Sequence, residues 1–442
     1  MFEVLSQKSN QYIAMHKFKI LTGLAVFSLV FIAFKSISYS EPKNLTPISD
    51  TSFVDHEEMQ LYKWRQQELK IAVEAYFNKA IASGNIVGAG VSIVKGDSII
   101  ISNGFGKRNI NLDKVVDAET VFRLGSISKG FAGVLSASLN TEGTLHWEDK
   151  VSDFIPEFQL GDAINTEKVT LATILSQTSG TPNHAYTNIL EAGLPLKDIA
   201  KRFKNIVPIS QPGVAYSYQN VMFALCGDMM QKATGQDINT LLKDRLFKPL
   251  GMQNTSTDNE TLIHTENIAM PHSQISHNYK VLKLNNKYYN AVAAGGVNAS
   301  AIDMAKWMRF LLGHNPEIMN QSAFQQAFQP FVEIKEHNKY YQKWPGHVAS
   351  FYGYGWRIHK YLDDTNKDEK TIWHHGGTVN NYRNEIALFP EDDLGICVLL
   401  NSNSKLAQTV IPDLQKIVNH IYKSNPLKMA ATSPEEKAKT VF

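Results

Sequence analysis

The amino-acid sequence predicts an α/β fold of the α+β type, in which one antiparallel sheet is built from both ends of the chain and flanked by helices. Runs rich in aromatic and β-branched residues, bounded by turn residues, lie in residues 87–106 and again in residues 351–401. Between them, residues 126–330 mostly place apolar side chains at helical spacing. We therefore expect the terminal strands to share one sheet, with a mainly helical region, about residues 140–345, inserted between them.

The elements can be followed in order along the chain. Residues 57–83 carry apolar side chains every three or four positions, which predicts a long first helix. The first two strand runs are separated by Gly96 and Asp97, and such a pair is typical of a tight hairpin. The clearest later helical patterns are residues 217–235, 300–313 and 405–423, and the last of these contains Pro412 near its start.

The length allows two or three domain-sized units or one large mixed domain. Because no linker is long enough to separate independent domains, we expect one globular unit over residues 57–425. The chain has 442 residues, 43% of them hydrophobic and 19% charged, so a sizeable core is available. Lys and Arg total 44 against 42 Asp and Glu, and this net charge of +2 argues against a nucleic-acid partner. Residues 426–442 are polar and small, and we expect a disordered tail there.

Residues 1–40 have the three-part pattern of an export signal. Lys17 and Lys19 precede the apolar residues 20–34, and small residues follow at alternate positions. The apolar stretch has 15 residues, which is short for a bilayer-spanning helix of about 20 residues. We expect a cleaved signal peptide and a periplasmic or otherwise exported protein. The alternative is an uncleaved N-terminal anchor that associates with the inner membrane through residues 20–34.

The cysteines and histidines give no sign of a metal or redox site. Cys226 and Cys397 each lie inside an apolar run, where burial is expected, and two cysteines cannot form a disulfide framework. His374 and His375 are adjacent on an expected strand and so point to opposite faces, which disfavours a shared metal ion. We predict neither a metal ion nor an organic cofactor.

The residues from Gly125 to Lys129 contain a candidate nucleophile and base. If Gly125 and Ser126 turn into a helix, Ser126 and Lys129 are three positions apart and face the same side. A serine hydroxyl is activated by a base, and lysine is one only when its pKa falls far below about 10.4. Burial and the positive end of a helix both lower that pKa. The alternative is that Ser126 caps a helix and Lys129 lies in solvent.

Two further motifs favour the catalytic interpretation. Tyr218 and Asn220 belong to a Tyr-Gln-Asn sequence expected to begin a helix, and residues 374–377, His-His-Gly-Gly, lie on an expected strand. With these motifs in this order, the chain resembles the serine β-lactamase and penicillin-binding protein superfamily. It is most similar to the branch of class C β-lactamases, D-alanyl-D-alanine carboxypeptidases and related esterases. The resemblance covers most of residues 60–425 and implies a β-lactamase/transpeptidase-like fold.

The resemblance implies a role for each motif residue. Ser126 would be the acylated nucleophile, Lys129 its partner in proton transfer, and Tyr218 the second member of the proton relay. Asn220, one helical step beyond Tyr218, would bind the substrate amide or orient Lys129. The backbone amides of Ser126 and Gly377 would form the oxyanion hole.

The third motif departs from that of many relatives, which have Lys-Thr-Gly. One frame makes His374 and Gly376 the first and last residues of the motif, both binding substrate, whereas a frame shifted by one begins at His375. The first frame is favoured, because Gly377 then follows the motif as the oxyanion-hole residue. Because histidine titrates near neutrality, a permanent positive anchor for a substrate carboxylate is lost. Arg383 could supply a cation near the pocket, although an ion pair with Glu385 is its default role.

The resemblance therefore implies a serine hydrolase that works through an acyl-enzyme at Ser126. Its substrate would be a small molecule or a peptide, namely a β-lactam, a D-amino-acid peptide or an ester. Histidine in place of the motif lysine argues against a specialised β-lactamase. The alternatives are a short-chain esterase of the same fold and a catalytically idle protein that binds cell-wall peptides.

Overall fold

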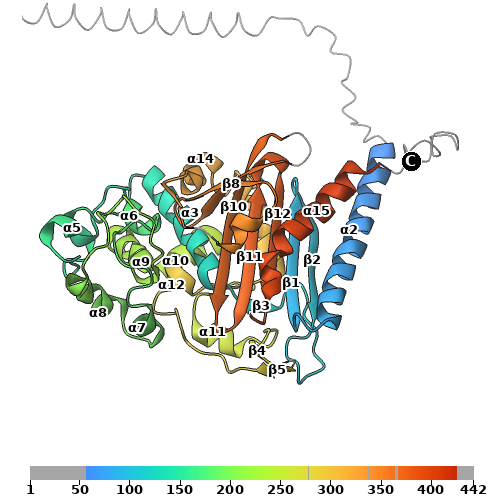
Figure 1. Ribbon diagram of the computed structural model, residues 1–442, viewed down its shortest axis with the longest axis horizontal. Coiled ribbons are helices and arrows are strands. Elements are labelled where there is room, and N and C mark those ends of the chain that lie inside the picture. The colour runs from blue at the N-terminus through green and yellow to red at the C-terminus, as the bar shows by residue number, and fades with distance from the viewer. Residues whose placement is uncertain (1–55, 277, 337, 364–366, 426–442) are drawn as a thin grey trace, which may run out of the picture. The chain divides into compact units, whose positions relative to one another are not determined.

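The sheet predicted from the two ends of the chain is present in the computed structural model, which describes residues 56–276, 278–336, 338–363 and 367–425. Eight antiparallel strands follow the order β2-β1-β12-β11-β10-β9-β8-β7 (Figure 1). They are β1 (Gly88–Lys95), β2 (Ser98–Gly106), β7 (Val332–Glu333), β8 (His347–Tyr352), β9 (Arg357–Leu362), β10 (Glu369–Val379), β11 (Tyr382–Phe389) and β12 (Leu394–Leu400).

The two ends of the chain meet where β1 pairs with β12. Ala89 lies opposite Leu400 and Lys95 opposite Leu394, so the full length of both strands is paired. The predicted hairpin between β1 and β2 is also present, and Gly96 has a φ of +58°, which a first turn position of this kind requires. The sheet therefore closes only when residues about 300 positions apart in sequence come together.

Each face of the sheet is covered by helices. The predicted first and last helices, α2 (His56–Ala82) and α15 (Val410–Lys423), are present, and from Gln60 onward they belong to one unit with the sheet. Phe77 of α2 and Leu414 of α15 share an apolar cluster with Val398 of β12. The neighbouring Cys397 and Leu399 point to the other face, into the cluster of the helical region. This alternation buries both faces, as the continuous apolar run of β12 indicates.

The inserted region is mainly helical, as predicted. Two short strand pairs that the sequence pattern did not indicate accompany its helices, β3 (Val121–Arg123) with β6 (Asn298–Ser300) and β4 (His272–Ile275) with β5 (Asn278–Val281). The helices are α3 (Ser128–Thr141), α4 (Val151–Phe154), α5 (Ala163–Glu167), α6 (Leu171–Leu175), α7 (Thr187–Glu191), α8 (Leu196–Ala200), α9 (Asn220–Thr234), α10 (Ile238–Leu242), α11 (Asn259–His264), α12 (Val292–Gly295), α13 (Ala301–Leu311) and α14 (Gln321–Phe324).

Short 3₁₀ and π turns complete the elements of the described residues. A single π turn, η3, extends α10, and the others are 3₁₀ turns. They are η1 (Gly125–Ile127), η2 (Lys201–Asn205), η3 (Lys243–Phe247), η4 (Gln325–Phe328), η5 (Tyr340–Lys343), η6 (Pro390–Asp392) and η7 (Lys405–Gln408).

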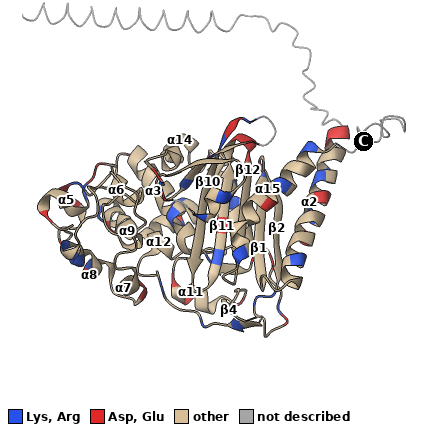
Figure 2. Ribbon diagram, in the orientation of Figure 1, with Lys and Arg blue, Asp and Glu red and all other residues tan. Residues whose placement is uncertain are grey.

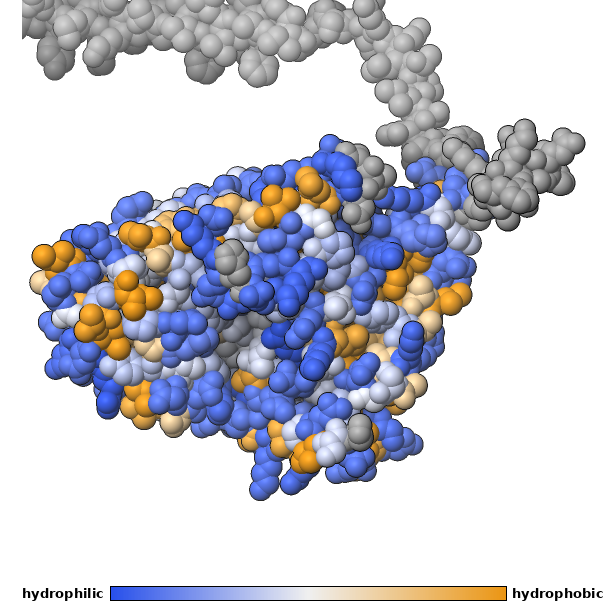
Figure 3. All heavy atoms as spheres, in the orientation of Figure 1, coloured by the Kyte–Doolittle hydropathy of each residue, from blue (hydrophilic) through white to orange (hydrophobic). Residues whose placement is uncertain are grey.

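The signal or anchor predicted in residues 1–40, including the apolar residues 20–34, and the tail predicted in residues 426–442 lie outside the described residues. Within the described ranges, we find no helix that combines the length and the apolar character needed to cross a bilayer. Charges of both signs are interspersed over the elements (Figure 2), in keeping with the net charge of +2. The face drawn in Figure 3 is largely hydrophilic, with scattered hydrophobic side chains.

Candidate active site

Ser126 lies in a sharp turn between β3 and α3. Gly125 has a φ of +59°, and a Cβ atom there would lie 2.8 Å from the backbone nitrogen of Thr378 on β10. Only glycine combines this backbone conformation with such a close approach. Ser126 then falls in the 3₁₀ turn η1, and Lys129 is the second residue of α3. The turn thus places the serine beside β10 of the large sheet.

Lys129 is fully buried and points at Ser126. Its Nζ lies 3.4 Å from Ser126 Oγ and donates to Asn220 Oδ1 at 2.7 Å and to the carbonyl of Ala294 at 2.8 Å. Burial lowers the pKa of the Lys129 amine, as a catalytic base requires. The capping alternative, with Lys129 in solvent, is therefore excluded.

Tyr218 is the third residue that meets at Ser126 and Lys129, although its local backbone structure differs from the prediction. Its hydroxyl donates to Ser126 Oγ at 2.9 Å. The helix α9 begins only at Asn220, and the intervening Gln219 is extended, with φ −143° and ψ 117°. Tyr218 and Asn220 are therefore not one helical step apart. In extended backbone, residues two apart point to the same side, which explains how both reach Lys129.

The protonation of Tyr218 is coupled to that of Lys129. Burial raises the pKa of the phenol, but the cations of Lys129 and Arg357 more than offset it, so the pKa lies below 10.0. The Lys129 Nζ also lies 4.9 Å from the centre of the Tyr218 ring. Because each group favours loss of its own proton, the pair is suited to accept and return the proton of Ser126.

The two histidines of the third motif point to opposite faces of the sheet, as predicted. Both are fully buried. The His375 ring lies 6.4 Å from that of Tyr218, and its Nε2 is 3.0 Å from the hydroxyl of Tyr352. The His374 ring packs against Trp344, on the side of α2 and α15. The direction of His375 toward Tyr218 therefore favours the frame that begins at His375 over the expected frame that begins at His374, although neither histidine lines the cleft around Ser126.

The same one-residue shift applies to the oxyanion hole. A Cβ atom at Gly377 would lie 2.0 Å from the carbonyl oxygen of Leu124, so Gly377 allows β10 to pack against the turn before Ser126. Gly376 and Thr378, in contrast, line the cleft together with Ser126. The position of Gly376 agrees with a role in substrate binding. The backbone nitrogen of Thr378 approaches Gly125, the residue before Ser126, which makes the Thr378 amide a better candidate for the oxyanion hole than that of Gly377.

The cleft has a volume of about 410 Å³ and contains a cation that the sequence did not reveal. This cation is Arg357, at the start of β9, which lines the cleft beside Tyr218. Its guanidinium carbon lies 5.9 Å from the centre of the Tyr218 ring. Its Nε has no hydrogen-bond partner, and no carboxylate among the described residues pairs with it. No motif marks this arginine, which follows an aromatic strand segment. The predicted cation, Arg383, also lines the cleft but pairs with Glu385 at 2.9 Å.

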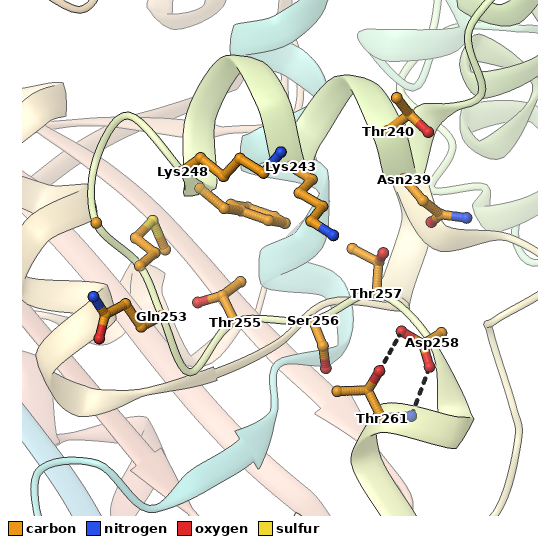
Figure 4. Close-up of a pocket in the computed structure, with 13 residues that line it drawn as sticks. Asn239, Thr240, Lys243, Lys248, Gln253, Thr255, Ser256, Thr257, Asp258 and Thr261 are labelled. Carbon is orange, nitrogen blue, oxygen red and sulfur yellow. Dashed lines mark hydrogen bonds between the residues drawn. The ribbon is translucent and has the colours of Figure 1, made fainter.

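A larger cavity lies elsewhere and lacks this chemistry. It has a volume of about 660 Å³ and is formed by α10, η3 and the segment before α11 (Figure 4). Lys243, Lys248 and several threonines line it, and Asp258 bonds the backbone and side chain of Thr261. It shares no residue with the cleft around Ser126. We therefore take the smaller cleft as the candidate active site.

Comparisons with known proteins agree with this geometry. The model of the Beta-lactamase family matches residues 73–416. Protein flp of Staphylococcus aureus (strain MW2) is 27% identical over 359 residues, which are 80% of this chain and 67% of that protein. The unguisins hydrolase ungD' of Aspergillus campestris (strain IBT 28561) is 25% identical over 72% of this chain and 59% of its own length.

Among solved structures, the octameric penicillin-binding protein homologue from Pyrococcus abyssi has the same fold. Its TM-score is 0.66 at 23% identity, with 78% of this chain and 77% of that chain covered. The family match extends across both sheet-forming ends and the helical region between them, and it supports a serine hydrolase-like function. The chain belongs to the beta-lactamase family, within the superfamily of serine β-lactamases and penicillin-binding proteins.

Proposed function

We propose that the chain hydrolyses carboxylate-bearing amides or β-lactams through an acyl-enzyme at Ser126. The observation that carries this proposal is the contact of Ser126 Oγ with two proton-transfer groups, the Tyr218 hydroxyl at 2.9 Å and the Lys129 amine at 3.4 Å. The name of the relative ungD', a hydrolase, and that of the solved penicillin-binding protein homologue support the same class of chemistry.

Acylation would begin when Ser126 Oγ attacks the carbonyl carbon and gives its proton to the Tyr218–Lys129 pair. The oxyanion would be held by the backbone amides of Ser126 and Thr378, at the positive start of the helical segment. Collapse of this intermediate would break the carbon–nitrogen bond, and the leaving nitrogen would take the proton back from Tyr218. Water would then hydrolyse the ester at Ser126.

Arg357 would bind the carboxylate of the substrate. The histidine motif lacks a permanent cation, because burial together with Arg357 holds the pKa of His375 well below 6.5. An arginine stays charged at any physiological pH, and Arg357 has no carboxylate partner of its own among the described residues. This arrangement favours substrates with a free carboxylate, such as D-amino-acid peptides and penicillins, over uncharged esters. The N-terminal pattern supports a proposed location outside the cytoplasm, where such substrates occur.

Intact-mass analysis after brief exposure to a fluorescent penicillin tests the proposal, with Ser126→Ala in parallel. We expect an adduct on the unaltered chain and none on Ser126→Ala. A long-lived adduct would indicate a penicillin-binding protein, and rapid loss with ring-opened product would indicate a β-lactamase. Absence of an adduct, together with no cleavage of D-alanyl-D-alanine peptides or nitrophenyl esters, would contradict the proposed function.

A further inference from the structure

Behind the third motif lies a buried carboxylate that the reaction described above does not use. Glu385 of β11 is fully buried, and its Oε2 accepts hydrogen bonds from the hydroxyl of Tyr340 at 2.8 Å and from Nε2 of His374 at 2.8 Å. Its Oε1 lies 2.9 Å from Arg383 but has no aligned hydrogen bond. Both bonds therefore go to Oε2, so a proton passed from His374 Nε2 arrives at this oxygen.

Only a glycine separates this carboxylate from the substrate cleft. A Cβ atom at Gly376 would lie 2.8 Å from the Tyr340 hydroxyl and 2.9 Å from Glu385 Oε2. Gly376, Tyr340 and Arg383 all line the cleft with Ser126. The absence of a side chain at Gly376 therefore allows the Tyr340–Glu385 bond to pass directly behind the cleft wall, and the charge of Glu385 acts on that wall.

A chain of hydrogen bonds connects Glu385 of β11 across β10 and β9 to β8. His374 Nδ1 lies 3.0 Å from Nε2 of His359, whose Nδ1 is 2.8 Å from the hydroxyl of Ser350, and that oxygen is 2.7 Å from Nε2 of His347. His347 is partly exposed and lines a separate cavity with Ser350. Since His374 donates to Glu385, its Nδ1 must accept, and the same reasoning fixes the direction of every bond back to His347.

The electrostatic setting places a mobile proton on Glu385 rather than on the histidines. Burial raises the pKa of Glu385 to about 7, although Arg383, the Tyr340 hydroxyl and Arg357 each act to lower it. Burial, followed by Arg357 and Arg383, holds the pKa of His374 well below 6.5. On β12, Glu385 faces the neutral thiol of Cys397, and the pKa of this thiol is raised by burial and by Glu385.

We propose that Glu385 is a positioning residue that sets the charge of the cleft wall, and that the chain from His347 to His374 delivers its proton. When Glu385 is ionised, it neutralises Arg383. When it is protonated, Arg383 becomes a free cation that faces the cleft, and anionic substrates bind more tightly. Protonation moves one proton along the chain. His374 gives its Nε2 proton to Glu385 and receives one at Nδ1 from His359. His359 is reprotonated from the hydroxyl of Ser350, which takes a proton from His347, and His347 takes one from water.

This inference rests on the proposed function, and a matched substrate pair separates the two. The probes are a chromogenic cephalosporin, which carries a carboxylate, and the same compound with the carboxylate esterified. Their ratio of kcat/KM cancels the titration of Lys129 and Tyr218, which act on both. From pH 8.5 to pH 5.5, we expect the ratio to rise roughly fivefold in favour of the anionic compound, the effect of one partly screened charge.

Two variants test the parts of the proposal. Glu385→Gln keeps the shape of the side chain but removes its charge. We therefore expect the kcat/KM ratio of this variant to equal, at every pH, the ratio that the unaltered protein reaches at pH 5.5. His359→Phe removes the donor to His374 Nδ1, so His374 can no longer be held as a donor to Glu385, and the midpoint should move to higher pH. If these residues acted on stability alone, the variants would change kcat/KM for both substrates equally and leave the ratio unchanged.

The outcomes are distinct. A ratio that does not depend on pH in the unaltered protein, or the same pH dependence in Glu385→Gln, would overturn the inference while leaving the proposed function intact. Failure of both compounds to acylate Ser126 would instead reject the proposed function. An unaltered midpoint in His359→Phe would overturn the role of the histidine chain.

Discussion

At the residue scale, no carboxylate among the described residues pairs with the buried amine of Lys129. It donates to two oxygens, Asn220 Oδ1 and the carbonyl of Ala294, and neither carries a negative charge. Tyr218 favours the ammonium form, but burial outweighs this effect and lowers the pKa of Lys129. The base form is therefore available at a pH below the usual value for lysine.

This predicts a pH dependence for acylation and a severe effect of Lys129→Arg. Because the amine accepts the serine proton only when neutral, the acylation rate should rise with pH, with a midpoint below 10.5. A guanidinium stays protonated, so Lys129→Arg should lower the rate by about a hundredfold or more. Stopped-flow acylation between pH 6 and pH 10 measures both. An arginine variant with an unchanged rate would exclude Lys129 as the base.

Arg357 carries the second prediction at this scale. Arg357→Gln removes the cation but keeps a polar side chain, and we expect KM for the carboxylate cephalosporin to rise about tenfold. KM for its ester should change little, because the ester makes no ion pair. Arg357→Lys serves as the matched control and should recover part of the affinity. Equal increases in KM for both compounds would show that Arg357 acts on packing rather than on the carboxylate.

At the scale of elements, the turn at Gly125 decides how closely Ser126 approaches β10. Gly125→Ala adds a Cβ atom 2.8 Å from the Thr378 backbone, at a φ of +59°. We expect the turn to shift, with at least a tenfold loss of acylation and a stability loss of about 1–3 kcal/mol. Thermal unfolding and acylation rates measure the two effects.

Gly143 provides the control for this prediction. Its φ is +72°, but a Cβ atom there would meet nothing within 4 Å. Gly143→Ala therefore carries the backbone strain alone, and we expect a stability loss of about 1 kcal/mol with full activity. If Gly125→Ala were no more harmful than Gly143→Ala, the close approach to β10 would not matter for the reaction.

What the sequence could predict at this scale depended on periodicity and on motifs. The helices around α2, α13 and α15 and the strands at both ends have clear patterns, and the structure confirms them. The start of α9 was misplaced, because Tyr218 has no local signal for extended backbone. The frame at His374 and His375 was ambiguous, since only the direction of each side chain relative to Ser126 separates the two. Arg357 and Ala294 reach the site through tertiary packing, which no local pattern encodes.

At the scale of the whole molecule, the sheet joins the two ends of the chain, and the site depends on that closure. β10 carries the third motif, and it is held in the sheet by β11 and β9. β12 connects this part to the N-terminal hairpin, while α2 and α15 cover the face opposite the helical region. The catalytic turn and the third motif therefore come together only when the C-terminal segment is folded.

Truncation at the C-terminus tests this dependence. A chain that ends at Ser404 lacks α15, so the apolar cluster that Val410 and Leu414 fill is exposed to solvent. It also loses the hydrogen bond from the Tyr76 hydroxyl to Asp413, which is 2.7 Å long in the full chain. Several buried aliphatic side chains at about 2 kcal/mol each exceed the net stability of a typical domain. We expect this chain to lack a cooperative thermal transition and to form no acyl-enzyme. A chain that ends at Asn425 removes only the predicted tail and should melt within a degree or two of the full chain. Cooperative unfolding of the shorter chain would show that the sheet closes without its last helix.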